Sequence, residues 1–132
     1  MKSKILLCFL ALCLTSCSTK YQQSKSTFFG DTCGYKDYRM DQNKFSITYN
    51  ANEYTRVDSV MDYALKRASE LCMENGFTHF VILSKKDIGI ENVTVTDNMI
   101  THHYHPGVII HIEGYNNNIP EGALNASHYQ NI

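Results

Sequence analysis

The sequence lacks the features that mark several common classes of protein. It has no excess of basic residues, since 12 Lys and Arg face 13 Asp and Glu, so it shows neither the charge expected for binding nucleic acid nor a basic patch for anionic lipids. It has no CxxC pair, and therefore no support for thioredoxin-like chemistry. It also lacks GxSxG, HExxH and the glycine loops that bind phosphate. These absences predict that the protein is not an enzyme and has no nucleic-acid partner.

The sequence has no hydrophobic run long enough for a transmembrane helix. The longest run, Ile5–Leu14, has ten residues, which is about half of what a helix needs to span a bilayer. It follows Lys2 and Lys4 and ends at small polar residues, which is the order of a secretory signal peptide. We therefore expect residues 1–16 to be removed on export.

A more specific pattern closes this signal. Leu14-Thr15-Ser16-Cys17 resembles the bacterial lipobox, in which an aliphatic residue and two small residues precede a cysteine. The resemblance implies that the Cys17 thiol receives a diacylglycerol, that a peptidase cuts before Cys17, and that the new amino group takes a fatty acid such as palmitate. The thiol supplies the nucleophile for the thioether, and two or more acyl chains anchor a protein stably. The alternative is an ordinary cleaved signal followed by a free periplasmic cysteine.

The residue after Cys17 bears on the membrane that receives the protein. Ser18 stands there and not aspartate. By resemblance to the sorting rule of enteric bacteria, this favours the outer membrane. We therefore expect a lipid-anchored protein that faces the periplasm.

The mature chain fits a tether and one domain. Without residues 1–16 it has 116 residues, of which ten are basic and thirteen acidic, a size typical of a single domain. Residues 17–33 are polar and rich in Ser and Thr, which predicts a lipidated flexible tether. Residues 34–132 are then the domain.

A long amphipathic helix is predicted over residues 56–75. Thr55 is a suitable N-cap with Asp58 three residues later, and Gly76 can adopt the left-handed conformation that ends helices. Apolar residues recur at spacings of three and four, which predicts a stripe that packs on a sheet. The stripe consists of Val57, Val60, Met61, Ala64, Leu65, Ala68, Leu71 and Cys72.

Strands are predicted on both sides of the helix. Residues 34–49 form a hairpin with a turn at 41–44, since Phe45, Ile47 and Tyr49 alternate with polar residues. Residues 77–84 are rich in β-formers and predict a strand parallel to the Phe45 strand or one place away from it.

The later part of the domain is more polar. Residues 85–98 are predicted to be a loop with at most a short strand at 93–95. Two strand pieces follow, at 99–104 and 108–112, and Pro106-Gly107 breaks them at an edge or a bulge. The sequence as a whole predicts an α+β fold, with an antiparallel or mixed sheet of about four strands and the long helix packed on one face.

Several of these segments, in the same order, resemble a family of small uncharacterised proteobacterial lipoproteins. The family's pattern is a Gly-Tyr hairpin, a helix with an Arg-Ala-Ala-Glu-like segment, and a glycine that leads into an aromatic-rich strand. This chain matches it with Gly34-Tyr35, Arg67-Ala68-Ser69-Glu70 and Gly76-Phe77, and the likeness covers roughly residues 34–84. Ser69 stands where alanine is usual, and Cys72 lies in a helical turn that normally lacks cysteine. The resemblance implies a lipoprotein and brings no catalytic residue or ligand with it.

The histidines are the candidate metal ligands. His102, His103 and His105 lie within four residues and His111 follows, and neutral imidazole binds Zn²⁺, Cu²⁺ and Ni²⁺. On a strand, His103 and His105 share one face, to which His111 or His79 would have to add a third ligand. The alternative is a polar strand end beside Pro106 on the surface.

Two further pairs of residues are candidates for structural roles. Arg67 and Glu70 have the i,i+3 spacing of an ion pair on a helix, which predicts a solvated or sheet-facing pair that fixes the orientation of the helix. Cys33 and Cys72 are the two thiols left after Cys17, so either they form a disulfide or Cys72 is a buried core thiol.

Two functions follow from the sequence. The first is a membrane-anchored lipoprotein with a structural or protein-interaction role in the cell envelope, whose partners are the membrane and envelope proteins, and which has no cofactor other than the lipid on Cys17. The alternative is a periplasmic lipoprotein that binds a transition metal through the His102–His111 segment.

Overall fold

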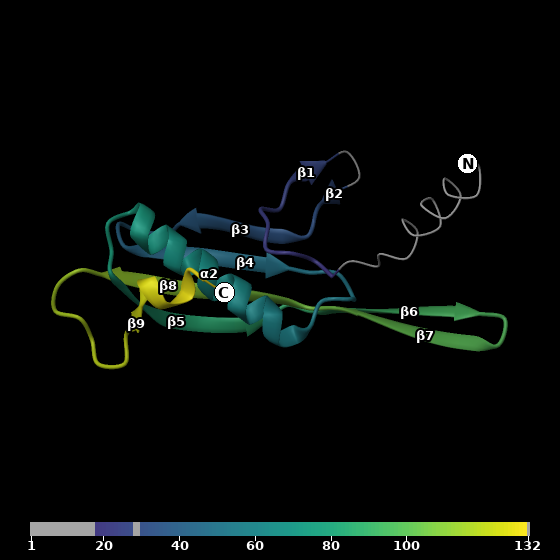
Figure 1. The fold of residues 1–132 in the computed structure, drawn as a ribbon. Coiled ribbons are helices and arrows are strands. Elements are labelled where there is room, and N and C mark those ends of the chain that lie inside the picture. The colour runs from purple at the N-terminus through teal and green to yellow at the C-terminus, as the bar shows by residue number, and fades with distance from the viewer. Residues whose placement is uncertain (1–17, 28–29, 132) are drawn as a thin grey trace, which may run out of the picture.

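The structure, a computed structural model, describes residues 18–27 and 30–131. Five strands form an antiparallel sheet in the order β3-β4-β8-β5-β9, and one long helix, α2 (Val57–Glu74), crosses one face of it (Figure 1). The strands are β3 (Gly34–Arg39), β4 (Lys44–Asn50), β8 (Gly107–Tyr115), β5 (His79–Asp87) and β9 (Leu124–Asn125). The predicted α+β class is confirmed.

Two smaller pairs of strands accompany this sheet. The first is a hairpin of β6 (Ile90–Thr96) and β7 (Met99–His105). Together with the five-stranded sheet it makes seven strands, where about four were predicted. The second pairs β1 (Ser26–Thr27) with β2 (Gly30–Asp31). A short 3₁₀ helix, η2 (Ala126–Tyr129), follows β9.

The first hairpin follows the prediction. Met40 N donates to Lys44 O at 2.8 Å, and the Asp41 carboxylate accepts from Gln42 N at 2.8 Å, so the turn lies at the predicted place. Phe45, Ile47 and Tyr49 of β4 are buried because they point at the helix. β8 lies between β4 and β5 and is antiparallel to both, so β5 runs parallel to β4 and one place away, as predicted.

The end of α2 is as predicted, but its start is not. Gly76 has φ +80°, Phe77 N donates to Cys72 O at 2.7 Å, and Gly76 N donates to Met73 O at 3.2 Å, which is the usual left-handed helix end. Arg56 is the N-cap residue and makes no side-chain cap. The predicted Thr55 cap is wrong because the Thr55 hydroxyl instead accepts from Thr19 N and donates to Asn52 Oδ1.

The buried stripe of α2 differs from the predicted one mainly at Val57 and Ser69, while Met61 and Leu65 of the predicted stripe are partly buried against the core. Val57, in the first turn of α2, is 56% exposed. It lines an open pocket with Tyr104 and Pro106 at the base of the β6–β7 hairpin. Ser69 is fully buried, and its hydroxyl donates to the carbonyl of Ala126. This bond replaces apolar contact where the 3₁₀ helix packs on α2. Val60, Ala64, Ala68, Leu71 and Cys72 are buried as predicted.

The predicted loop over residues 85–98 is wrong. β5 continues to Asp87, and the chain then forms β6, pairs with β7 and returns through Pro106 into β8. Figure 1 shows this hairpin projecting well beyond the helix and the main sheet. Every residue of β6 is exposed, so the strand has no face buried in the domain, and only residues 93–96 carry the apolar–polar alternation of a strand.

Candidate functional site

The beginning of the described chain is bound to the domain and does not behave as a free tether. Thr19 is buried, its N–H donates to Thr55 Oγ1 at 2.7 Å, and its hydroxyl accepts from Asn52 N at 2.7 Å. Tyr49, in the core, donates its hydroxyl to Lys20 O at 2.6 Å. Within the predicted tether of residues 17–33, Thr19 and Lys20 are therefore hydrogen-bonded to the domain.

The segment continues along the edge of the sheet beside β3. Ser24 N donates to Tyr35 O and Tyr35 N donates to Gln22 O, both at 2.8 Å. Gly34 has φ +135°, and a Cβ there would lie 2.4 Å from Gln22 O. Only glycine allows the segment to come this close, which gives a physical reason for glycine in the Gly34-Tyr35 pair.

Tyr21 joins this segment to α2. Its ring stacks on Tyr35 with centroids 5.2 Å apart, Lys66 Nζ lies 4.8 Å from its centre, and its hydroxyl donates to Glu70. Burial, and then the bond to Glu70, raise the pKa of Tyr21 above its ordinary value. The phenol therefore stays protonated and keeps donating across the whole physiological range.

Arg67 is the centre of an ion-pair network that joins α2 to β3. Its Nε lies 2.7 Å from Asp37 Oδ2, and its terminal nitrogen lies 3.3 Å from Glu70 and 3.2 Å from Glu74. The guanidinium also lies over the Tyr35 ring at 4.6 Å. Burial disfavours its charge, but the bond to Asp37 and the negative charges of Asp37 and Glu74 together outweigh this and raise the pKa of Arg67.

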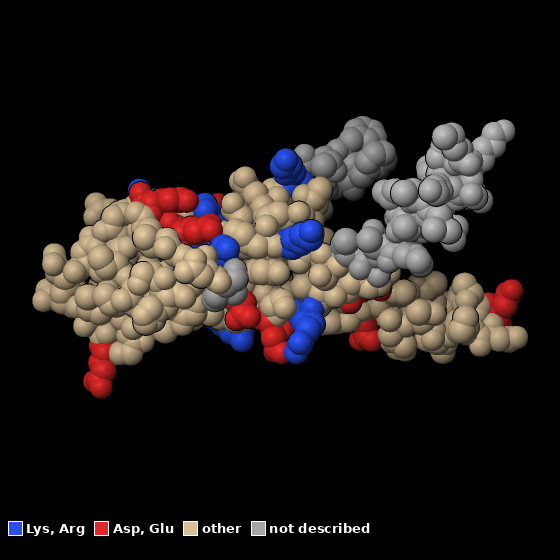
Figure 2. All heavy atoms as spheres, viewed as in Figure 1, with Lys and Arg blue, Asp and Glu red and all other residues tan. Residues whose placement is uncertain are grey.

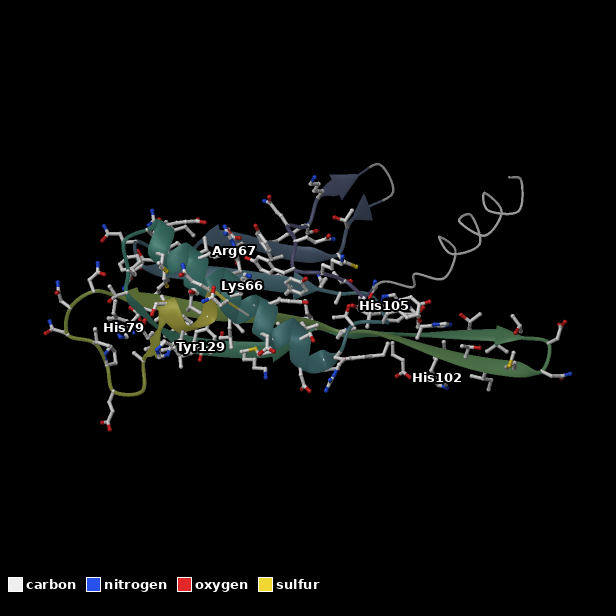
Figure 3. All side chains as sticks on the ribbon, in the orientation of Figure 1. Lys66, Arg67, His79, His102, His105 and Tyr129 are labelled. Carbon is white, nitrogen blue, oxygen red and sulfur yellow. The ribbon has the colours of Figure 1, made fainter. Side chains whose placement is uncertain are left out.

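The predicted pair of Arg67 and Glu70 is thus present, and it faces the sheet. Figure 3 shows Arg67 and Lys66 on the side of α2 that carries β3 and the N-terminal segment. Because Arg67 holds Asp37 and stacks on Tyr35, and Glu70 holds Tyr21, the network fixes the helix, the edge strand and the N-terminal segment together.

The structure does not gather the predicted metal ligands. His103 and His105 fall on one face of β7 and His102 on the other, as their alternation requires, but His103 bonds to Glu53 and His102 Nδ1 lies 2.8 Å from Glu91. The bond from His103 lowers the pKa of Glu53. Figure 3 places His79 at the far end of the molecule from His102 and His105.

His111 completes the candidate set, and it is also distant. It lies six residues beyond His105 along β7 and β8, which is roughly 20 Å in an extended chain. Within residues 18–27 and 30–131, no three His, Cys, Asp or Glu side chains are grouped to hold a metal ion. Of the predicted metal ligands, His103 and His105 are therefore the two that share one face of β7.

Of the two alternatives for Cys33 and Cys72, the structure has the one without a disulfide, since both thiols are free and Cys72 is buried. Cys33 precedes the first residue of β3, whereas Arg39 at the other end of that strand bonds to Asn75, three residues after Cys72. The two thiols therefore lie about 20 Å apart along the strand, while a disulfide needs Cα atoms within about 7 Å. Cys17 lies outside the described residues.

The two free thiols are expected to differ in reactivity. Burial raises the pKa of Cys72 to about 12, so at pH 8 it holds roughly a thousandfold less thiolate than an ordinary thiol of pKa about 8.5. In a chain without residues 1–17, and so without the other three cysteines, we expect the Cys33→Ser variant to release no colour from Ellman's reagent until urea unfolds it, and the Cys72→Ser variant to react while folded. Equal rates for the two folded variants would contradict the burial of Cys72.

Comparison with known proteins identifies no family for this chain. No family model matches the chain, and no match is found among the curated proteins or the solved structures. In the described part of the chain, no helix has the length and apolar character required to cross a membrane.

The sequence did not reveal Thr19, Tyr21 and Asn52 as the residues that dock the N-terminal segment. Polar residues at positions 18–33 look like a linker, because the hydrogen bonds that hold them come from Asn52 and Thr55, more than thirty residues away. The available signal is the presence of aromatic residues in a mainly polar stretch, of which Tyr21 is the one that the structure places against α2.

Proposed function

We propose that the protein is a lipoprotein of the cell envelope, anchored through Cys17, whose domain has a structural or protein-interaction role at the membrane surface. The lipobox-like Leu14-Thr15-Ser16-Cys17 supports the anchor, and the Ser18 that follows supports the outer membrane as its place. The resemblance to small proteobacterial lipoproteins over residues 34–84 points the same way.

The observation that carries this proposal is the fixed position of Thr19. Its backbone and hydroxyl are bound by Asn52 and Thr55, and Cys17 is two residues earlier. Two residues reach at most about 7 Å, so a lipid on Cys17 holds the folded domain directly against the bilayer. A protein that worked far from the membrane would need a long free tether, and here the chain is bound from its third mature residue.

Lipidation of Cys17 can be tested in cells with an alkyne analogue of palmitate. We expect wild-type protein and the Cys33→Ala variant to become labelled, and the Cys17→Ala variant to carry no label. Cys33→Ala is the matched control because it removes a cysteine outside the lipobox. Equal labelling of the Cys17→Ala variant would refute the proposed anchor.

A further inference from the structure

The β6–β7 hairpin exposes large apolar side chains that the domain does not cover. Val95 is 72% exposed and Ile100 is 65% exposed, and they are cross-strand partners near the tip. A two-stranded hairpin alone in water is marginally stable, and clustered exposed apolar residues mark a contact surface. The hairpin therefore presents a surface that lacks a partner within the described chain.

The apolar residues are concentrated on one face. The strand register puts Val93, Val95, Ile100 and Tyr104 together, with the pair of Glu91 and His102 between them; we call this the Val95 face. The opposite face is mostly polar and has Ile90 and Met99 at its ends. It contains Asn92, Thr94, Thr96, Thr101 and His103.

The Val95 face continues the face of the main sheet that packs on the helix. Val108 and Ile110 of β8 are buried under α2, and Tyr104 lies on the same side, since it lines an open pocket with Val57 and Met61. α2 begins at Val57, so the helix covers the sheet and leaves the hairpin bare. What covers the Val95 face must come from outside the domain.

The anchor emerges beside the base of this hairpin. Asn52 holds Thr19, its neighbour Glu53 bonds to His103 of β7, and Ala51 N donates to Pro106 O at 2.9 Å. Each strand of the hairpin has seven residues and so reaches about 23 Å beyond its base. The lipid thus attaches at the junction of the hairpin and the domain body, which lie at opposite ends of the long axis in Figure 1.

This position restricts how the molecule meets a bilayer. A short tether at the base of the hairpin keeps the hairpin within reach of the membrane surface, because either end-on orientation would move the attachment point away from the lipid. Asp97 at the tip opposes deep insertion. No Lys or Arg follows Lys86, and Figure 2 shows no basic residue on the visible side of the hairpin, so anionic headgroups are not what it attracts.

We propose that the Val95 face is a second membrane contact, which binds in the boundary between headgroups and acyl chains of the bilayer that holds Cys17. This inference rests on the proposed lipid anchor. Burying an apolar face in that boundary is how interfacial segments bind uncharged lipid, and the lipid on Cys17 keeps this face close to the surface.

The test uses tryptophan, because the chain has none of its own. Val95→Trp places one tryptophan on the Val95 face, and Thr94→Trp, the adjacent exposed residue of β6, places one on the opposite face. Both full lipidated proteins are reconstituted in phosphatidylcholine vesicles with ordinary or brominated acyl chains. We expect emission from Val95→Trp to shift to shorter wavelength and to lose most of its intensity in brominated lipid, while Thr94→Trp does neither.

Two other outcomes overturn the inference. Quenching of Val95→Trp that is no stronger than that of Thr94→Trp removes the oriented contact. A shifted but unquenched Val95→Trp, in a protein that sediments as a dimer in detergent, assigns the face to a second copy of the chain. Mass spectrometry of Cys17 in the same sample separates the two proposals, since an unmodified Cys17 overturns the anchor and this inference with it, whereas a lipidated protein without quenching overturns the inference alone.

Discussion

Replacing Phe80 with alanine is expected to lower the free energy of unfolding by about 3–5 kcal/mol, the usual cost of removing a buried aromatic ring. Phe80 is fully buried in β5, between Gly114 of β8 and Leu124 of β9, and its ring lies 6.1 Å from that of Tyr129. The cavity would open where the sheet, α2 and the 3₁₀ helix meet. Urea unfolding followed by circular dichroism measures the loss.

Leu83→Ala is the matched control for this substitution. Leu83 lies on the same strand, three residues further along, and is 49% exposed. Surface substitutions of this kind usually change stability by no more than about 0.5 kcal/mol. If Phe80→Ala unfolded at the same urea concentration as Leu83→Ala, the core described for this sheet would be wrong.

Arg67→Ala is expected to lower the free energy of unfolding by about 2–4 kcal/mol. This is more than an exposed ion pair contributes, which is about 1 kcal/mol, and less than the loss when one partner of a fully buried pair is removed. The Arg67 side chain is 14% exposed, and its loss leaves Asp37 and Glu70 as half-buried carboxylates without their shared cation. The stacking on Tyr35 is lost as well. Urea unfolding gives the magnitude, and faster proteolysis within residues 18–25 would report release of the N-terminal segment.

Arg56→Ala provides the control for charge. Arg56 pairs with Asp58 at 3.6 Å, but both side chains are more than 80% exposed, so this change should be nearly neutral. Arg67→Lys should fall between wild type and Arg67→Ala, because lysine keeps the charge but cannot bond in the planar fork of a guanidinium. An Arg67→Ala protein as stable as Arg56→Ala would show that the network does not hold the helix to β3.

The parts of the fold that the sequence predicted are those with a periodic pattern and a local end signal. β4 alternates Phe45, Ile47 and Tyr49 against polar neighbours, and α2 repeats apolar residues every three or four positions and ends at Gly76. In both elements one face is buried against the other, so the period of each element appears directly in its sequence. The pair of Arg67 and Glu70 was predictable for the same local reason.

The β6–β7 hairpin escaped prediction because it has no buried face within the domain. Without a core to face, β6 mixes polar residues with exposed valines, and only Val93 to Val95 suggested a strand there, whereas β7 coincides with the strand predicted over residues 99–104. The same mixture becomes informative once the register is known, because it separates the Val95 face from the polar face opposite.

The site was less predictable than the fold, because its contacts are distant in sequence. Thr19 is bound by Asn52 and Thr55, and Tyr21 by Glu70, which lies 49 residues later. Sequence spacing alone cannot report such pairs. The same limit left two alternatives open for Cys33 and Cys72, and the structure has the second of them, in which both thiols are free and Cys72 is buried in the core.

The mass of the N-terminal peptide of the mature protein tests directly whether Cys17 carries the lipid anchor. Trypsin cuts after Lys20, so a chain processed at the lipobox yields a peptide of Cys17, Ser18, Thr19 and Lys20. We predict that this peptide, purified from the membrane fraction, carries a diacylglyceryl group on the Cys17 sulfur and a fatty acid on its amino group. A peptide with a free Cys17 thiol, or a chain cut elsewhere or still joined to residues 5–16, would show that Cys17 is not the lipid anchor.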